Sequence, residues 1–174
     1  MNEEQPLQII PFSEEEHLSL VPELTELLHE AYKPLADRGF RYSATHQSPE
    51  ITLKRLKYFE SFLAFWNGQL AGTIALIKWK ADSPCEYYRR EGLYHFGQYA
   101  VKPEFQGRGI ARSLLFHIEK RTRDLGGKEL ALDTAKGAIE LIDMYKRHGY
   151  KAVSTTRWES TNYRSIIMAK EISF

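Results

Sequence analysis

The chain has 174 residues, 43% of them hydrophobic and 13% aromatic, which is enough to bury one substantial core. Its 24 basic and 23 acidic residues nearly cancel, so the charge balance gives no reason to expect a nucleic-acid or membrane partner. The lone cysteine, Cys85, excludes an internal disulfide and a cysteine-based zinc cluster and favours a reducing compartment. We therefore expect a single domain over residues 1–174, located in the cytoplasm, with no metal, no secretion signal in Met1–Glu4 and no membrane-spanning segment.

The first half of the chain predicts strands and helices joined by one longer loop. Ser13 and Glu16 have the spacing of a capping box, which marks the start of a helix after the first strand. Gly39 ends a helix in which apolar residues recur at three- and four-residue steps. Ser48 and Pro49 are typical of an N-cap and a first helical turn. In chain order we expect a strand over 7–12, a helix over 22–35, a loop over 40–48 and a helix over 49–58.

A hairpin and a third strand follow. Asn67 and Gly68 both tolerate positive φ, which a type I′ turn requires at its two central positions. Pro103 breaks the third strand, because proline has no N–H for a sheet ladder. The strands are expected over 61–66, 69–80 and 93–101, with a polar loop over 81–92 before the third.

The last part of the chain alternates helices and strands. Gly126 and Gly127 stop one helix, and Gly149 closes another. The aromatic residues of the last two strands fit a homodimer interface, and they fit equally well an ordinary hairpin packed on the core. The expected elements are a helix over 110–125, a strand over 129–133, a helix over 138–147 and strands over 150–158 and 163–172.

The turn between the third strand and the next helix is rich in glycine and reads Gln106-Gly107-Arg108-Gly109-Ile110-Ala111. Such a turn leaves several backbone N–H groups unpaired at the positive end of the helix dipole, where phosphate binds. The glycines lack Cβ atoms, so a pyrophosphate can approach the main chain closely, and Arg108 and Arg112 add positive charge. The same glycines would also serve to shape a tight turn that binds nothing.

Two other phosphate-binding motifs fit this turn badly. A Walker loop needs Gly-Lys-Ser/Thr, whereas the sequence has Gly109-Ile110-Ala111. A Rossmann fingerprint requires a third glycine where Arg112 stands, early in an alternating βαβ fold. Here the turn follows three strands of hairpin type instead.

The segment from Val101-Lys102-Pro103 to Ala111 resembles the signature of the GNAT superfamily of N-acetyltransferases, Gln/Arg-x-x-Gly-x-Gly/Ala after a strand that ends near Val-x-Pro. The likeness continues in Leu132-Asp133-Thr134, in Met144–Tyr150, which is similar to the family's Leu-Tyr-x-x-x-Gly-Phe helix end, and in Asn162-Tyr163-Arg164. The resemblance implies an α/β fold with a mixed, mostly antiparallel sheet of six or seven strands, helices on both faces and a splay between strands four and five.

By the same resemblance, the chain transfers an acetyl group from acetyl-CoA to an amine. The backbone amides of the turn would hold the CoA pyrophosphate, and the exposed backbone of the fourth strand would pair with the pantetheine arm. The residues so assigned to the cofactor are Tyr99, Val101, Gln106, Gly107, Arg108, Gly109, Ile110, Ala111 and Arg112.

The resemblance also implies that Tyr145 is the general acid. A phenol suits this role, because with an ordinary pKa near ~10 it can give a proton to a departing thiolate at neutral pH. Without that role, Tyr145 would be an ordinary residue of an amphipathic helix. The family often carries a glutamate base on the fourth strand, and this strand has none between Leu93 and Val101. His95 and Gln98 are the candidates for a base or for orienting a water, although a strand histidine is commonly a packed one.

The acceptor in such folds lies between the first two helices and the far side of the splay. Arg41 could hold a carboxylate there, and the tyrosines could wall an amine pocket. We expect a small-molecule amine ahead of a protein amino terminus. A non-catalytic acyl-CoA-binding sensor is the alternative from another class, and it would have no use for Tyr145. The candidate acceptor residues are Tyr32, Arg41, Tyr42, His46 and Gln47.

Overall fold

The computed structural model describes residues 6–172, so the expectation about Met1–Glu4 lies outside the described residues. The strands are β1 (Leu7–Pro11), β2 (Glu60–Trp66), β3 (Gln69–Lys78), β4 (Leu93–Val101), β5 (Glu129–Ala135), β6 (Lys151–Thr156) and β7 (Ser165–Glu171). The helices are α1 (Glu14–His17), α2 (Val21–Asp37), α3 (Pro49–Tyr58), α4 (Ile110–Asp124) and α5 (Ile139–Arg147). Short 3₁₀ turns are η1 (Leu18–Leu20), η2 (Ser43–Thr45), η3 (Glu86–Arg89) and η4 (Pro103–Phe105). Within residues 6–172, no helix has the length and apolar character needed to span a bilayer.

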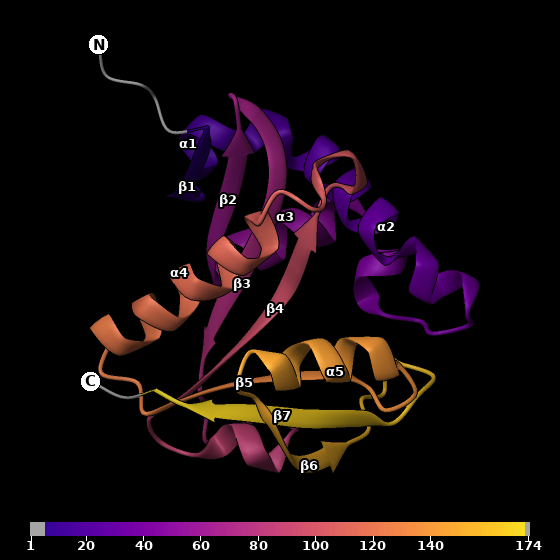
Figure 1. Ribbon diagram of the computed structural model, residues 1–174, viewed down its shortest axis with the longest axis vertical. Coiled ribbons are helices and arrows are strands. Elements are labelled where there is room, and N and C mark those ends of the chain that lie inside the picture. The colour runs from indigo at the N-terminus through magenta and orange to yellow at the C-terminus, as the bar shows by residue number, and fades with distance from the viewer. Residues whose placement is uncertain (1–5, 173–174) are drawn as a thin grey trace.

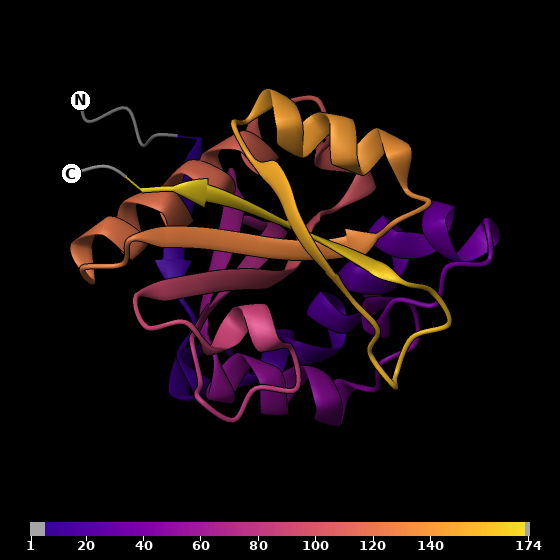
Figure 2. The same cartoon turned by 90° about the horizontal axis from the view of Figure 1, so that it is seen from below.

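The seven strands form one sheet in the order β1-β2-β3-β4-β5-β7-β6. Neighbouring strands are antiparallel except β4 and β5, which run parallel. Helices α4 and α5 cover one face and α2 and α3 the other (Figure 1); in Figure 2 the orange α5 lies above the strands and the purple helices lie below them. The predicted fold class is therefore confirmed. Strand β6 is an edge strand with an exposed surface, so a homodimer interface there stays a prediction.

Strands β4 and β5 pair only at one end. Their register joins Leu93–His95 of β4 to Glu129–Ala131 of β5. Beyond His95 the two strands diverge, as Figure 1 shows, and within residues 6–172 the rest of β4 pairs with β3 alone. The predicted splay is confirmed at this position.

Each face of the sheet buries its own core. Under α4, the side chains of Ile110, Leu114 and Ile118 are at most 1% exposed, at the helical spacing that the sequence predicted. Under α2, Leu24 and Leu28 are equally buried against the other face. Because helices cover both faces of the sheet, the region where β4 and β5 diverge connects one helical layer with the other.

Two local sequence signals act as predicted. Asn67 and Gly68 have φ values of 47° and 78°, both positive, and they join β2 to β3 in a hairpin. The Ser48 hydroxyl accepts a hydrogen bond from the N–H of Ile51 at 3.3 Å and so caps α3.

The capping box predicted at Ser13 and Glu16 does not form. Ser13 is the N-cap of α1, but within residues 6–172 its hydroxyl makes no capping hydrogen bond. Its backbone N–H donates to Nδ1 of His17 at 2.9 Å. The buried His17, at the end of α1, thus accepts the hydrogen bond that the capping box assigns to Glu16.

Candidate active site

The glycine turn opens the N-terminus of α4. Gly107 and Gly109 have φ values of 79° and 80°, in the left-handed region that residues with side chains rarely adopt. Gly109 is the N-cap, and its carbonyl accepts a hydrogen bond from the N–H of Ser113 at 3.0 Å. The N–H groups of the first helical turn, which starts at Ile110, have no partner inside the helix. The turn is therefore shaped to receive an anion.

Side chains add positive charge and order to this turn. The guanidinium of Arg108 lies over the ring of Trp66 at 5.5 Å, and the exposed Arg112 follows on the first turn of α4. Nε2 of Gln106 donates to the carbonyl of Val101 at 3.2 Å, which ties the turn to the end of β4. Two cations beside free N–H groups fit the pyrophosphate of a CoA-type cofactor.

Strand β4 carries a bulge where it leaves β5. Gln98 has a φ of 49°, an unusual value for a residue with a side chain, and the β3–β4 register shifts between Thr73 and Ala75. Oε1 of Gln98 accepts a hydrogen bond from Nε2 of Gln47 at 2.9 Å, although the two residues are 51 positions apart. The buried Gln47 thus helps to hold the unusual backbone of Gln98 in place.

A cavity of about 520 Å³ runs through the splay. Its walls come from α2 and α3 on one face of the sheet, from α4 and α5 on the other, and from β4 and β5 between them. A cavity with both kinds of wall allows a cofactor and an acceptor to meet. The predicted site residues that it brings together are Tyr32, Tyr42, Gln98, Tyr99, Val101, Gln106, Ala111 and Tyr145.

Tyr145 lies on α5 and lines this cavity, with 7% of its surface exposed. Its ring packs against those of Phe96, Tyr99 and Tyr150 at centroid distances of 6.1, 6.5 and 6.1 Å. Its hydroxyl has no hydrogen-bond partner among residues 6–172. Burial, and then the neighbouring phenol of Tyr32, raises the pKa of Tyr145 well above its ordinary value, so the phenol keeps its proton at neutral pH.

Two further tyrosines join the helical layers to β4. The hydroxyl of Tyr32 donates to the carbonyl of Tyr99 at 3.1 Å, and the hydroxyl of Tyr99 donates to the carbonyl of Ala111 at 2.6 Å. Burial raises the pKa of both phenols, so both stay neutral. The wall predicted for the acceptor and the strand predicted for the cofactor thus meet at Tyr99.

Nine predicted residues do not line the cavity. Five of them belong to the glycine turn and the helix start beside it: Gly107, Arg108, Gly109, Ile110 and Arg112. The other four are His95, Arg41, His46 and Gln47. His95 stacks on Tyr88 with ring centroids 3.9 Å apart, beside a separate hollow of about 280 Å³, and burial lowers its pKa to about 3. Arg41 and His46 have exposed side chains, and Arg41 reaches Asn162 only through its backbone N–H. Gln47 is buried behind the cavity wall and reaches it through its hydrogen bond to Gln98.

The cavity wall contains two charged residues that sequence reasoning missed, Arg55 and Asp133. The hydroxyl of Tyr88 donates to Oδ1 of Asp133 at 2.8 Å, and Nε1 of Trp158 donates to Oδ2 at 2.9 Å. Burial raises the pKa of Asp133, and these two hydrogen bonds oppose the shift. A lone carboxylate after the apolar Leu130-Ala131-Leu132 was the available signal for Asp133, whereas Arg55 stands in a polar helical stretch that gives none.

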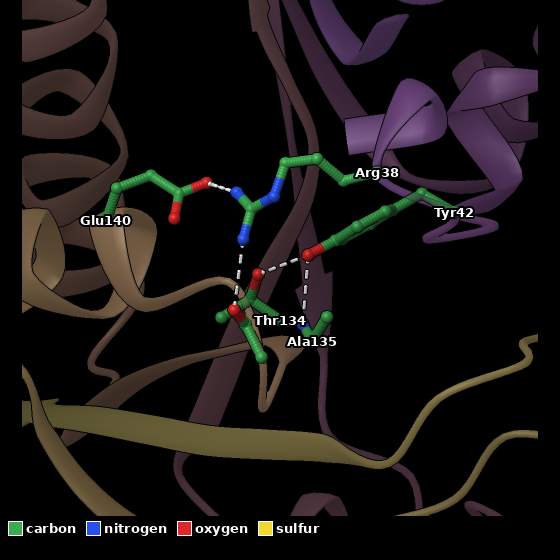
Figure 3. A network of polar contacts seen from close by, with 6 residues as sticks. Arg38, Tyr42, Thr134, Ala135 and Glu140 are labelled. Atoms are coloured by element: carbon green, nitrogen blue, oxygen red, sulfur yellow. Dashed lines mark hydrogen bonds and ion pairs between the residues drawn. The ribbon is translucent and has the colours of Figure 1, made fainter. Parts of the chain in front are cut away.

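The segment that follows α2 lines one side of the cavity. Figure 3 shows the polar contacts that hold this segment. Oγ1 of Thr134 lies 2.8 Å from the hydroxyl of Tyr42, which also accepts a hydrogen bond from the N–H of Ala135 at 2.9 Å. Arg38 forms an ion pair with Glu140 on α5. These contacts fasten the segment to the end of β5 and the start of α5.

Metal-ligating side chains do not gather at this site. Across residues 6–172, no group of three His, Cys, Asp or Glu side chains is placed to hold a metal ion.

Comparison with known proteins agrees with this geometry. The acetyltransferase (GNAT) family matches residues 21–150. The S-(2-succino)cysteine N-acetyltransferase of Bacillus subtilis (strain 168) is 32% identical over 130 residues, which cover 74% of this chain and 76% of that protein.

Solved structures share the fold at low sequence identity. The ribosomal-protein-S18-alanine N-acetyltransferase from Escherichia coli matches with a TM-score of 0.69 and 18% identity, over 97% of this chain and 95% of that one. A GNAT family acetyltransferase from Elizabethkingia anophelis with acetyl-CoA bound matches with a TM-score of 0.65 and 17% identity, over 97% and 99% of the two chains. The family match and the relative together establish that the chain belongs to the acetyltransferase (GNAT) family and is an acyltransferase.

Proposed function

We propose that the chain acetylates the primary amine of a small molecule with acetyl-CoA, by direct attack in a ternary complex. The observation that carries the proposal is the single cavity through the splay. Its wall includes Gln106 and Ala111 from the cofactor turn and Tyr32 and Tyr42 from the acceptor side. The relative named for S-(2-succino)cysteine, a small molecule, supports a small acceptor, and the solved neighbour named with acetyl-CoA supports the co-substrate.

The residues present fit the cofactor in two places. The N–H groups that follow Gly109 would hold the pyrophosphate, with Arg108 and Arg112 balancing its charge. Beyond His95, β4 lacks the partner that β5 gives it earlier, so Tyr99 and Val101 would pair there with an extended ligand segment.

Tyr145 would act as the general acid. Acetyl-CoA, when bound, supplies the acetyl group as a thioester, whose C–S bond breaks as the new C–N bond forms. Tyr145 would give its phenolic proton to the departing sulfur. A raised pKa does not prevent this, because the same dry surroundings that hold the proton on the phenol also disfavour a bare thiolate.

Asp133 would accept the proton that the amine loses. It is the one carboxylate in the cavity wall, and the donors Tyr88 and Trp158 hold both of its oxygens in place. Of the two candidates from the sequence, Gln98 lies in the wall but its amide is not a base, so we propose that it fixes the β4 bulge or orients a water. His95 stacks on Tyr88, whose hydroxyl donates to Asp133, so we propose that His95 supports Asp133 indirectly.

The proposal is tested by two measurements on the purified protein. Calorimetry with acetyl-CoA reads cofactor binding. A thiol-release assay then covers amines, amino acids, polyamines, aminoglycosides, short peptides and S-(2-succino)cysteine. Release with a small amine is the expected result. Release with peptides alone would contradict the small-molecule acceptor and favour a protein amino-terminal acetyltransferase, and absent binding would contradict the cofactor.

Two observations argue against the alternative of a non-catalytic sensor. A relative that is 32% identical over 74% of this chain is named as an N-acetyltransferase, and the cavity joins Tyr145 to the acceptor wall. Cofactor binding without release for any amine in the panel would restore it.

A further inference from the structure

Arg55 places a guanidinium in the acceptor side of the cavity without a carboxylate beside it. The residue lies on α3 and lines the cavity. Within residues 6–172 it belongs to no ion pair, and the one hydrogen bond of its side chain runs from Nη1 to Oε1 of Gln47 at 2.7 Å. Burial lowers the pKa of Arg55 below its ordinary value, because the cation loses contact with water. A partly desolvated cation of this kind favours an anionic ligand.

A network of hydrogen bonds through the buried Gln47 holds the guanidinium of Arg55 in place. Gln47 is 2% exposed, and its Nε2 donates to Oγ1 of Thr52 at 2.8 Å and to Oε1 of Gln98 at 2.9 Å. The amide oxygen of Gln47 accepts the hydrogen bond from Arg55, so both the oxygen and the nitrogen of this amide have hydrogen-bond partners. Arg55 itself uses one of the five N–H donors that a guanidinium carries. The network therefore holds a donor-rich cation in the cavity wall and links it through Gln47 to Gln98 in the β4 bulge.

The charges of the cavity wall are one cation and one anion. Arg55 and Asp133 are the two charged residues in the wall, and they are not paired with each other. Both oxygens of Asp133 are held by Tyr88 and Trp158. A ligand that carries one positive and one negative group would match both charges, and a guanidinium binds a carboxylate through two parallel hydrogen bonds.

We propose that the acceptor amine also carries a carboxylate, which Arg55 binds, so that the acceptors are amino acids or similar zwitterions. The proposal rests on the proposed function, because it names the class of amine that the same cavity takes. A carboxylate is favoured over a phosphate because one negative charge balances the single guanidinium, whereas a second would face Asp133 without a partner cation.

The experiment uses acceptors in matched pairs, each L-amino acid beside its carboxamide, in the thiol-release assay with acetyl-CoA. The wild-type protein should prefer the acid of at least one pair by roughly 10- to 100-fold in kcat/KM. In Arg55→Gln, that preference should fall to within about twofold, while kcat/KM for the amide changes little. Arg55→Lys, which keeps the charge but loses the planar fork, should retain part of the preference.

The matched control is Lys54→Gln, which removes an exposed cation from the neighbouring position of α3 and should leave the preference unchanged. If Arg55 only positioned Gln47, the Arg55→Gln variant would lower kcat/KM for acid and amide alike and keep their ratio, which would overturn the proposal. Equal turnover of acid and amide by the wild-type protein would also overturn it while leaving the proposed function intact.

If no acceptor is turned over, a binding measurement distinguishes failure of this inference from failure of the proposed function. The same pairs are titrated calorimetrically into the protein saturated with CoA. Tighter binding of an acid than of its amide, lost in Arg55→Gln, would support the inference even though the transfer had failed. Equal or absent binding across all pairs would overturn it.

Discussion

The hydroxyl of Tyr42 lies 2.8 Å from Oγ1 of Thr134 and joins two segments that are 92 residues apart in the chain. The same oxygen accepts a hydrogen bond from the backbone N–H of Ala135 at 2.9 Å (Figure 3). One phenol thus closes the cavity wall and satisfies two polar groups at the end of β5, where the strand has already parted from β4. The wall of the cavity and the stability of the fold therefore depend on the same atom.

Tyr42→Phe is expected to lower the free energy of unfolding by about 1–3 kcal/mol, because it leaves the buried N–H of Ala135 and the hydroxyl of Thr134 without this partner. Urea unfolding should show a lower midpoint with an unchanged slope. Tyr58→Phe, at a tyrosine that is 63% exposed, is the control and should leave the midpoint in place. A midpoint equal to that of the wild-type protein would mean that other groups form the hydrogen bonds of Ala135 and Thr134 in the variant.

Tyr145→Phe is expected to reduce kcat roughly 10²- to 10⁴-fold with little change in KM, because the variant keeps the ring but has no proton to donate. The ring contacts with Phe96 and Tyr150 are retained, and the lost hydroxyl has no partner within residues 6–172, so thermal stability should change little. Steady-state kinetics and a melting curve test this together. Tyr94→Phe, in the same core but outside the cavity wall, should keep wild-type turnover. Unchanged kcat in Tyr145→Phe would exclude it as the acid.

The pH profile of kcat/KM should carry an acidic limb set by Asp133. A base works only when ionised, so activity rises as the pH passes upward through its pKa. Burial shifts that pKa above the ordinary value near ~3.9. Asp133→Asn should remove the limb and lower kcat/KM by roughly 10²-fold or more.

His95→Phe is the paired variant for this profile, because it keeps the stack on Tyr88 and removes the titrating ring. With a pKa of about 3, His95 is neutral from pH 5 to 8 and should leave the limb unchanged. A limb that survives Asp133→Asn and disappears in His95→Phe would return the base role to His95.

Gly109→Ala should weaken CoA binding and cost about 1–2 kcal/mol of stability. A Cβ at this position meets no atom within 4 Å, so the cost arises from a φ of 80° that alanine adopts poorly. Relief of that strain would rotate the N–H groups that face the pyrophosphate. The control is Gly126→Ala at the other end of α4, which has a φ of 74° and equally open space. It should lose similar stability and keep the dissociation constant of CoA measured by calorimetry. Equal CoA affinity in the two variants would contradict the assigned role of the turn.

Several features of the fold follow from short stretches of sequence. The turn at Asn67 and Gly68, the cap at Ser48 and the helix start after Gly109 are all in place, because each depends on the backbone preferences of a few adjacent residues. The capping box at Ser13 failed for a reason that is also local, because the imidazole of His17 accepts the hydrogen bond from the Ser13 N–H that Glu16 was expected to accept.

The cavity wall required the tertiary structure. Arg55 stands in a polar stretch of α3, so no local pattern marks it as part of a site. Gln47 was a candidate acceptor residue, but its contacts with Arg55 and with Gln98, 51 residues away in the sequence, appear only in the folded chain. His95 lies on the same strand as Tyr99 but faces a different hollow, because alternate strand residues point to opposite faces and the bulge at Gln98 changes the alternation.

The sequence by itself therefore determined the family, the glycine turn and the position of Tyr145, since these are read from contiguous motifs. The tertiary structure decided which charges share the cavity with them. Arg55 and Asp133 line one cavity only because α3 packs on the sheet that contains β5, and that packing depends on contacts between distant parts of the chain.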